Sequence, residues 1–387
     1  MNMAARSSNI FLKSFCYIVS VFLYCEFLIY YVVLLQCDWP NLDSRIRVGN
    51  DRPVYAMFLA DTHLLGRRNG HWFDKLRREW QMHRAFQTAM TLHRPQLVFI
   101  LGDLFDEGLW CSGEEFNDYV DRFFTLFKVP HETKLYIVAG NHDIGFHYNV
   151  SPYLAGRFAR KMDGPPVQMV TVRGNHFVLI NSMAMEGDGC FLCQNATSAI
   201  NNITSTLRCM KGTSTRKCDR LSLQERYSRP ILLQHFPMYR ISDEVCTESD
   251  AVPLAERGVK FRERWDCLSR ESTEYLVDSL EPRVALGGHT HHACYITHSF
   301  GSPGPDLKKM VEYSVPSFSW RNRNNPSFML GVFTPDQYKI SKCFMPKEST
   351  VIRLYIISAA AFVAFIVIYL KRKCRLRRTY YKKESYH

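Results

Sequence analysis

Polar side chains with metal-binding atoms follow five separate apolar runs of the chain. The first run, "YAMFLA" (55–60), is followed by "DTH", and the second, "LVFIL" (97–101), by "GDLFD". After the five runs, in chain order, come Asp61 and His63; Asp103; Asn141, His142 and Asp143; His235; and His289 and His291. Carboxylate, amide and imidazole ligands without thiolates are typical of Mn, Fe or Zn sites. These donors exceed what one ion needs, so they predict two ions that share a bridging carboxylate.

The chemistry that such a pair of ions performs is phosphoester hydrolysis. Two ions about 3.5 to 4 Å apart can clamp a phosphoryl group and activate a water for in-line attack. Taken singly, a histidine after a strand is more often structural, and a Gly-Asp or Gly-His pair is common at turns. The prediction therefore depends on the joint pattern of five strand ends and not on any one motif.

The apolar runs alternate with helical patterns, as expected of an α/β fold. Residues 74–93 and 114–127 have helical spacing of apolar side chains, and they separate the runs at 55–60, 97–101 and 135–139. This βαβαβ order predicts a parallel core sheet with helices on its faces, and such sheets assemble their sites at the carboxyl ends of the strands. Further strands are predicted at 177–181, 231–234 and 284–287, and in "EYSVPSF" and "FMLGVF".

Two apolar segments lie outside this domain. Residues 15–36 are long enough to cross a bilayer, with Glu26 as their only charge, and residues 354–370 carry no charge. A charge at mid-membrane is costly unless it is paired. The alternative for the first segment is a cleaved signal peptide, but the bulky residues at its end make a poor cleavage site. We therefore predict two transmembrane helices.

The distribution of charge predicts the orientation of these helices. Residues 371–387 contain eight Lys or Arg and one Glu, and residues 1–14 contain Arg6 and Lys13. The positive-inside tendency places both ends in the cytosol and residues 37–353 in the lumen. Because most of the net charge of +12 lies in the tail, the basic composition is no evidence for nucleic-acid binding. A membrane-surface tail is the better interpretation.

Cysteines and glycosylation sequons agree with a luminal domain. Ten of the 13 cysteines fall between residues 37 and 343, where an oxidising compartment lets many of them pair. Asn149, Asn195 and Asn202 each begin an Asn-x-Ser/Thr triplet. Residues 187–219 hold four cysteines and two sequons and are interpreted as a disulfide-stapled, glycosylated insertion. Their "CFLC" (190–193) resembles a redox motif, but a structural disulfide is favoured.

The ordered motifs "DTH", "GDLFD", "GNHD", "QH" and "GHTH" resemble the calcineurin-like metallophosphoesterase family over about residues 54–295. The resemblance implies an α/β sandwich with a dinuclear site. It implies that one metal is bound by Asp61, His63 and His291, that the other is bound by Asn141, His235 and His289, and that Asp103 bridges them. It also implies His142 as proton donor to the leaving oxygen and Asp143 as the group that orients its ring. Ala60 and Glu107 depart from the family's usual Gly and Arg, which leaves phosphate neutralisation unassigned.

The motifs "CEFLIYY", "HWFDKLRREWQM" and "SVPSFSWRNRNNPSF" resemble a membrane-bound branch of this family. The resemblance implies two Mn²⁺ ions and removal of the ethanolamine-phosphate side branch from the second mannose of GPI anchors. It also implies action on GPI-anchored proteins at endoplasmic reticulum exit sites, the intermediate compartment and the cis-Golgi, with cargo receptors as possible partners. The alternatives are a luminal hydrolase of another lipid or sugar phosphate, and a non-catalytic cargo adaptor.

The loop at residues 319–327 supplies candidate substrate contacts. Arg321 and Arg323 could pair with phosphate and Asn322 with sugar hydroxyls. A solvated turn between strands is an equally good interpretation. His147 also lies near the expected site, where an ordinary loop histidine is favoured over a substrate contact.

Overall fold

A computed structural model of the chain describes residues 2–43, 52–214, 218, 226–300 and 308–384. The chain divides into two compact units. One unit contains the apolar segments at the two ends of the chain, and the other, residues 34–345, contains the motifs that carry the predicted metal ligands. Residues 215–217 and 219 of the predicted insertion, and the last three residues of the basic tail, lie outside the described residues.

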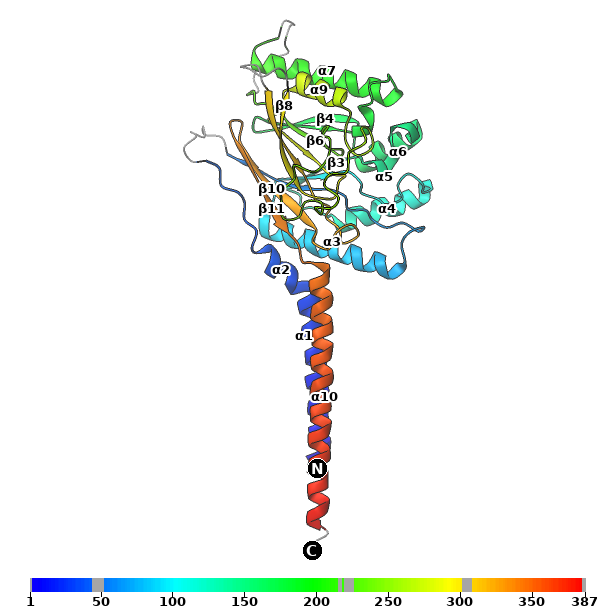
Figure 1. Cartoon of the computed structure of the whole chain (residues 1–387), viewed down its shortest axis with the longest axis vertical. Coiled ribbons are helices and arrows are strands. Elements are labelled where there is room, and N and C mark those ends of the chain that lie inside the picture. Colours follow the sequence, from blue (N-terminus) through cyan, green and yellow to red (C-terminus); the bar gives the residue numbers. More distant parts are fainter. Residues whose placement is uncertain (1, 44–51, 215–217, 219–225, 301–307, 385–387) are drawn as a thin grey trace. The chain divides into compact units, whose positions relative to one another are not determined.

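The ligand-bearing unit is a sandwich of two sheets (Figure 1). The first sheet has the order β11 (Tyr338–Phe344), β10 (Ser327–Phe333), β1 (Val54–Leu59), β2 (Leu97–Leu101) and β3 (Lys134–Val138). The second has the order β4 (Val167–Val172), β5 (Asn175–Ile180), β6 (Ile231–Gln234), β7 (Val284–Gly287), β9 (Lys308–Ser314) and β8 (Cys294–Phe300).

Strand directions explain why so many motifs meet at one edge. β1, β2 and β3 are parallel, and so are β5, β6, β7 and β9, while β10, β11, β4 and β8 are antiparallel to their neighbours. The predicted parallel core is therefore confirmed for the strands that precede the motifs. The later strands add antiparallel pairs, and the chain forms a second sheet that the βαβαβ pattern did not predict.

Aromatic side chains between the sheets lock the two layers together. Phe99 of β2 lies 5.0 Å from Phe177 of β5, measured between ring centroids, and Phe177 lies 5.4 Å from Phe333 of β10. All three rings are fully buried. The free energy gained by burying apolar side chains is roughly proportional to the area removed from water, so this layer holds the two sheets together. The strand ends of the two sheets are thereby fixed relative to each other.

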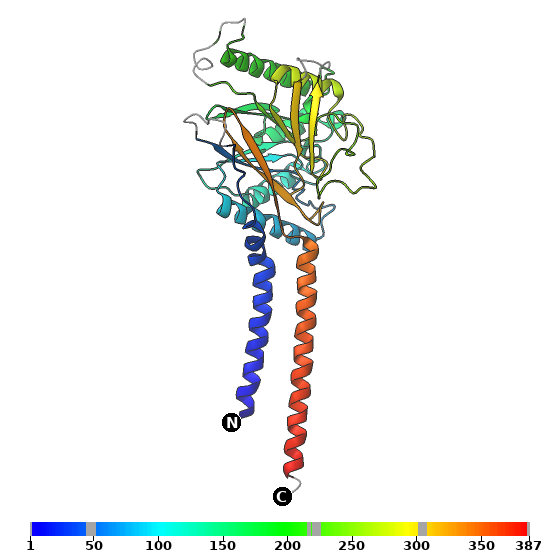
Figure 2. The ribbon, with the colours of Figure 1, turned by 60° about the vertical axis from the view of Figure 1, so that its left-hand side comes forward.

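Helices cover the outer faces of the sandwich. α3 (Trp72–His93) and α4 (Gly113–Leu126) pack against each other, and α7 (Phe191–Lys211) packs on β4 and on α9 (Arg270–Leu280). In Figures 1 and 2, α3 and α7 lie on opposite sides of the two sheets. The connections between strands contain three short helices and one longer helix. These are α5 (Asn141–Ile144), η2 (His147–Asn149), η3 (Ser182–Ala184) and α6 (Pro152–Met162).

The insertion at residues 187–219 is more ordered than its composition indicates. Most of it is α7, whose buried side includes Leu192, Ala196 and Ile200 at a spacing of four residues. The abundant Asn, Ser and Thr between them hid this periodicity, so no helix was predicted for the segment. Disulfides Cys190–Cys193 and Cys209–Cys218 hold its two ends, as expected of a stapled segment.

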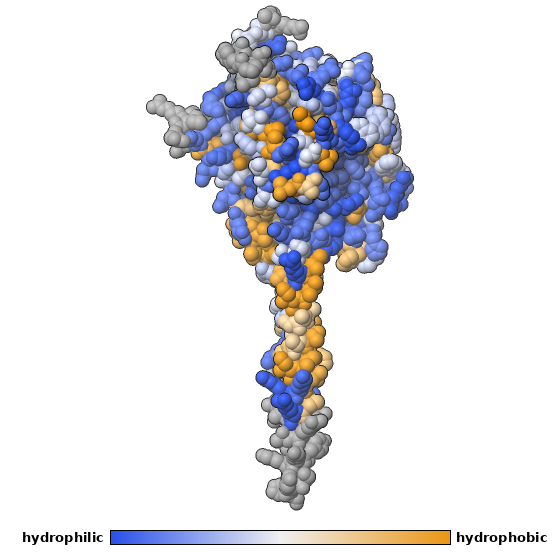
Figure 3. Space-filling view, viewed as in Figure 1, coloured by the Kyte–Doolittle hydropathy of each residue, from blue (hydrophilic) through white to orange (hydrophobic). Residues whose placement is uncertain are grey.

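The other unit consists of long apolar helices. The N-terminal stretch is α1 (Asn2–Leu23), the π-helical turn η1 (Tyr24–Leu28) and α2 (Ile29–Leu34), and the C-terminal one is α10 (Glu348–Glu384). Ile10–Leu34 and Glu348–Arg375 are long and apolar enough to cross a membrane by length and composition, and the helices present a mostly hydrophobic surface (Figure 3). Glu26 accepts a hydrogen bond from the Tyr355 hydroxyl at 2.6 Å. The one acidic group of the first helix is therefore paired.

Candidate dinuclear metal centre

The loops that follow the strands bring all seven predicted metal ligands to one edge of the sandwich. Five of them have backbone conformations in the left-handed region, which non-glycine residues rarely adopt. These are Asp61 (φ 53°), His63 (φ 44°), Asp103 (φ 49°), His289 (φ 72°) and His291 (φ 61°). Such conformations cost free energy and persist at sites where the surroundings enforce them. The strained residues lie where each loop turns sharply away from its strand and directs a side chain into the centre.

The first group of donors comes from the loops after β1 and β7. His291 Nε2 lies 3.6 Å from Asp61 Oδ1 and 3.3 Å from His63 Nε2, and His63 Nε2 lies 4.0 Å from Asp61 Oδ1. The carboxylate and both imidazoles therefore direct their atoms at one point. That arrangement agrees with a common metal ion.

The second group comes from the loops after β3, β6 and β7. His235 Nε2 lies 3.1 Å from the Asn141 side-chain oxygen. His289, His235 and Asp103 place one donor atom each within 4.8 Å of one another. The amide of Asn141 thus offers a neutral oxygen to a group of donors that already contains the Asp103 carboxylate.

Asp103 lies between the two groups. Its Oδ2 is 3.5 Å from His63 Nε2 and 3.3 Å from His235 Nε2, while its Oδ1 accepts a hydrogen bond from the His142 backbone N–H at 2.8 Å. A single carboxylate oxygen therefore faces a histidine of each group. This is the position that a bridging ligand would take.

Hydrogen bonds on the outer ring nitrogens determine which nitrogen faces inward in three of the candidate histidine ligands. His63 Nδ1 lies 3.2 Å from Asp106 Oδ1, His235 Nδ1 lies 2.8 Å from the Leu101 carbonyl, and His289 Nε2 lies 2.8 Å from the Trp265 carbonyl. Each acceptor holds a ring proton on the outer nitrogen, so the inner nitrogen is the atom directed at the centre. Sequence reasoning did not assign a role to Asp106 or Trp265. The second aspartate of "GDLFD" was visible, but nothing local pointed to Trp265.

Burial and neighbouring charges set the protonation of the centre. Burial raises the pKa of Asp61 well above its ordinary value. Burial works against the charged forms of Asp103 and His235, but their mutual attraction holds the pKa of Asp103 well below its usual range and raises that of His235 to about 9. Burial and the charge of His235 lower the pKa of His289 to about 3, so this imidazole is neutral, the form that binds metals.

Glycines precede the ligands because the loops approach each other closely. Gly102 has a φ of 87°, and a Cβ atom there would lie 2.5 Å from His235 Nδ1. A Cβ atom at Gly140 would collide with Asp103. A larger residue at either position would therefore push a candidate ligand out of the centre.

His142 has an exposed side chain beside the centre, and its ring lies 4.7 Å from that of His63. The predicted contact between Asp143 and the His142 ring is not what the structure shows. His142 Nδ1 bonds the Asp106 carbonyl at 3.1 Å, and the Asp143 carboxylate accepts the backbone N–H groups of Leu104, Phe105 and Gly140. Asp143 is buried and unites two loops, because a carboxylate has enough lone pairs for three donors.

The three predicted substrate contacts have different surroundings. Arg321 is exposed and its Nη2 lies 3.6 Å from Asp106 Oδ2. Arg323 is buried and donates to the carbonyls of His291 and Asp250, and Asn322 donates to the Ser317 hydroxyl at 3.0 Å. Arg323 and Asn322 therefore brace the ligand loops, while Arg321 remains available to neutralise a phosphate.

Comparison with known proteins supports a divalent metal centre. The profile of the calcineurin-like phosphoesterase family matches residues 56–293. The chain is 47% identical over 366 residues to "Metallophosphoesterase 1" of Ailuropoda melanoleuca, covering 94% of this chain and 91% of that one. It is 46% identical to the Gallus gallus protein of that name over 93% and 90% of the two chains, and 44% identical to the Danio rerio protein over 91% and 90%.

Proposed function

Because this chain belongs to the calcineurin-like phosphoesterase family and is a metal-dependent phosphoester hydrolase, we propose that it removes the ethanolamine-phosphate side branch from the second mannose of GPI anchors. The observation that carries the proposal is its similarity to Metallophosphoesterase 1 proteins along more than nine tenths of the chain. Apolar helices long enough to cross a membrane lie near both ends of this chain. A catalyst tethered to a membrane shares one surface with a lipid-anchored substrate, which raises the effective concentration of each for the other.

The donors of the centre would hold two divalent ions. One ion would be bound by Asp61, His63 and His291, the other by Asn141, His235 and His289, with Asp103 between them. When bound, such a pair neutralises phosphate charge and lowers the pKa of a coordinated water. We propose Mn²⁺ as the physiological ion, since oxygen and imidazole donors suit it.

Residues around the centre would carry the remaining steps. His142 has its Nδ1 committed to the Asp106 carbonyl, so its Nε2 is the atom that would give a proton to the departing mannose oxygen. Arg321, exposed beside Asp106, would pair with a non-bridging phosphate oxygen. The backbone N–H of His142 donates a hydrogen bond to Asp103. This contact holds the residue proposed as proton donor next to the carboxylate proposed as bridging ligand.

We propose that the domain faces the lumen of the early secretory pathway. Four disulfides, Cys37–Cys343, Cys190–Cys193, Cys209–Cys218 and Cys246–Cys294, use eight of the ten cysteines of the domain. Such density favours an oxidising compartment. The asparagines of the three sequons are exposed, as glycan attachment requires. The proposal extends to endoplasmic reticulum exit sites, the intermediate compartment and the cis-Golgi, with GPI-anchored proteins as substrates and cargo receptors of the exit sites as partners.

The test is mass spectrometry of GPI glycans from cells that lack the gene and are complemented with defined variants. Wild-type protein should remove the phosphoethanolamine on the second mannose, while Asp103→Asn, expressed to the same level, should leave it in place. If Asp103→Asn restores GPI-protein transport fully, the protein acts as a cargo adaptor and not as a catalyst. If wild-type protein leaves the glycan unchanged but hydrolyses other luminal phosphoesters, the substrate assignment is wrong and the metal centre stands.

A further inference from the structure

Three aromatic side chains, two of them exposed and one half-buried, form a cluster beside the metal centre. Phe146, Tyr148 and Trp265, here called the aromatic shelf, have ring centroids 4.9 Å apart for Phe146 and Trp265 and 5.2 Å apart for Tyr148 and Trp265. Tyr148 is 60% exposed and Trp265 is 40% exposed. Aromatic surface left in water at the edge of a catalytic centre is a common feature of ligand sites.

The shelf is continuous with the candidate metal ligands. The Trp265 carbonyl holds the outer nitrogen of His289 at 2.8 Å. The buried ring of Phe236 lies 4.4 Å from His289 and 6.1 Å from Phe146, again between centroids. A substrate whose phosphate binds at the centre would therefore meet the shelf with the group that it carries on that side.

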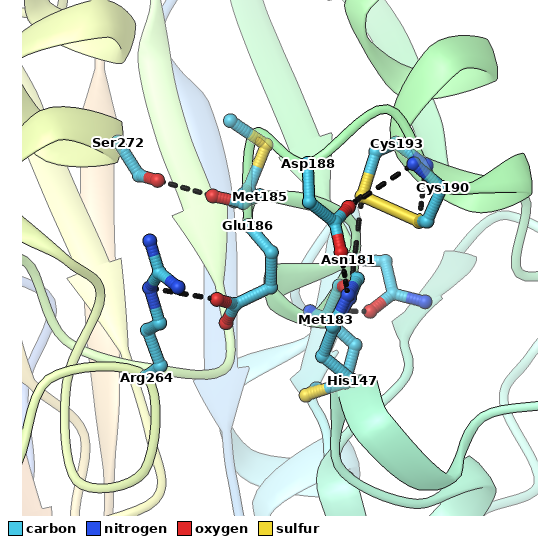
Figure 4. The surroundings of a disulfide bond; sticks show 10 residues. All are labelled: His147, Asn181, Met183, Met185, Glu186, Asp188, Cys190, Cys193, Arg264 and Ser272. Atoms are coloured by element: carbon cyan, nitrogen blue, oxygen red, sulfur yellow. Dashed lines mark hydrogen bonds and ion pairs between the residues drawn. A yellow bond between two sulfur atoms is a disulfide. The ribbon is translucent and has the colours of Figure 1, made fainter.

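Two polar side chains next to the shelf residues make three contacts with one supporting segment, residues 183–188 (Figure 4). His147, which lies between two shelf residues in sequence, bonds Asp188 at 2.8 Å and the Met183 carbonyl at 3.0 Å. Arg264, which precedes Trp265, pairs with Glu186 at 2.9 Å. Segments that are distant in sequence are thus fixed relative to each other before a ligand arrives, which lowers the entropy that binding must overcome.

The disulfide at the start of α7 reinforces this support. The Asp188 carboxylate accepts the backbone N–H of Cys190 at 3.0 Å and lies 3.4 Å from Cys193 Sγ (Figure 4). The Cys190–Cys193 link therefore holds the carboxylate that orients His147. The role of this pair of cysteines is local, since it spans only three positions in sequence.

We propose that the aromatic shelf binds the pyranose ring of the phosphorylated glycan, an inference that rests on the proposed function and assigns the sugar subsite. A pyranose has an apolar C–H face that packs on an aromatic ring and hydroxyls at its edge. Beside the ring of Trp265 lie Arg262 and Asp266, joined by an ion pair at 2.9 Å, and Arg262 is largely exposed. These groups offer donors and acceptors at the level where sugar hydroxyls would project.

The surroundings of the shelf favour a sugar over the other parts of the substrate. The Arg262 guanidinium already lies 5.1 Å from the Trp265 ring centre, so the ammonium of ethanolamine would meet a like charge there. An acyl chain would cover this ion pair and offer it no hydrogen bond in place of water. A neutral sugar ring can pack its apolar face on the aromatic rings and direct its hydroxyls to the charged groups beside them.

The test compares two substrates on the full-length protein in detergent. One is a mannoside glycan that carries phosphoethanolamine, and the other is ethanolamine methyl phosphate, which has the same phosphodiester and ammonium but no sugar. Tyr148→Ala and Trp265→Ala should lower the ratio of kcat/KM for the glycan to kcat/KM for the small diester about tenfold, mainly through the KM of the glycan. Trp265→Tyr should restore most of the ratio. Trp72→Ala, at an exposed tryptophan of α3, is the control and should leave the ratio unchanged.

Each outcome decides the proposal. A ratio that stays constant in both alanine variants overturns it, even when both substrates are hydrolysed more slowly, because the shelf would then be only structural. If wild-type protein hydrolyses neither substrate, the proposed function fails, and titration calorimetry with the phosphate-free trimannoside tests the shelf separately. Tyr148→Ala should then weaken binding about tenfold, and equal affinity would overturn the inference. Both assays are repeated on Asn149→Gln, so that an N-linked glycan of the chain itself does not compete for the shelf.

Discussion

Asp106 Oδ1 lies 3.2 Å from His63 Nδ1, and the same carboxylate is 3.6 Å from the guanidinium of Arg321. One residue therefore connects a candidate metal ligand with the exposed arginine that is proposed to meet a phosphate. Both contacts are to side chains distant in sequence. The relationship makes Asp106 a positioning residue for the centre.

Asp106→Ala should weaken metal binding at the His63 position about 10- to 100-fold, because the ring loses the acceptor that fixes its tautomer. Asp106→Asn keeps an oxygen acceptor and should retain most of the affinity. Metal content after dialysis against graded Mn²⁺ measures the effect without relying on activity. Equal metal content in the alanine variant and the wild type would show that His63 is oriented by other contacts.

His142→Gln should lower kcat by about 10²- to 10⁴-fold for a diester with a sugar leaving group, because no proton donor remains for the departing oxygen. The loss should shrink when the leaving group is nitrophenolate, which departs without a proton. Metal content should stay near the wild-type value, since the His142 side chain does not belong to the candidate ligands. A uniform loss for both leaving groups would argue for a role in substrate positioning.

Gly102→Ala should remove metal from the centre, because the new Cβ would displace the His235 ring. Gly212→Ala is the matched control: its φ is also positive, at 74°, but nothing lies within 4 Å of the added atom. Both variants should lose about 1–2 kcal/mol of stability from the left-handed conformation. Only Gly102→Ala should lose metal as well, as measured by metal analysis alongside thermal unfolding. Full metal content in Gly102→Ala would mean that the loop relaxes around the added methyl group.

Arg321→Ala and Arg323→Ala separate substrate contact from loop support. Arg321 is exposed, so its loss should reduce kcat/KM by roughly 10- to 100-fold, as expected for a charge-assisted hydrogen bond to phosphate, with an unchanged melting temperature. Arg323 is buried and bonds two carbonyls, so its loss should cost about 2–3 kcal/mol of folding stability. Steady-state kinetics and thermal unfolding on the same preparations distinguish the two. A destabilised Arg321 variant with normal kinetics would reverse the assignment.

Much of the fold was predictable because its signals are local. The strands at 97–101, 231–234 and 284–287 begin and end where their apolar runs do, and the helix predicted at 74–93 is α3. α7 was not predicted because polar residues occupy its exposed side, although three of its buried apolar residues recur every four positions. The antiparallel strand pairs and the second sheet were not predicted because strand pairing is a contact between distant segments. The periodicity within one strand does not identify the strand with which it pairs.

The sequence by itself determined the donor types, their place directly after strands, and the apolar helices, because these depend on residue identity and short-range pattern. Only the tertiary structure decided which nitrogen of His63, His235 and His289 faces inward, since their acceptors come from other strand ends and loops. It also decided the disulfide pairs, the separate tasks of Arg321 and Arg323, and the aromatic shelf. Each of these requires segments far apart in the chain to meet, and the packing of the two sheets brings them together.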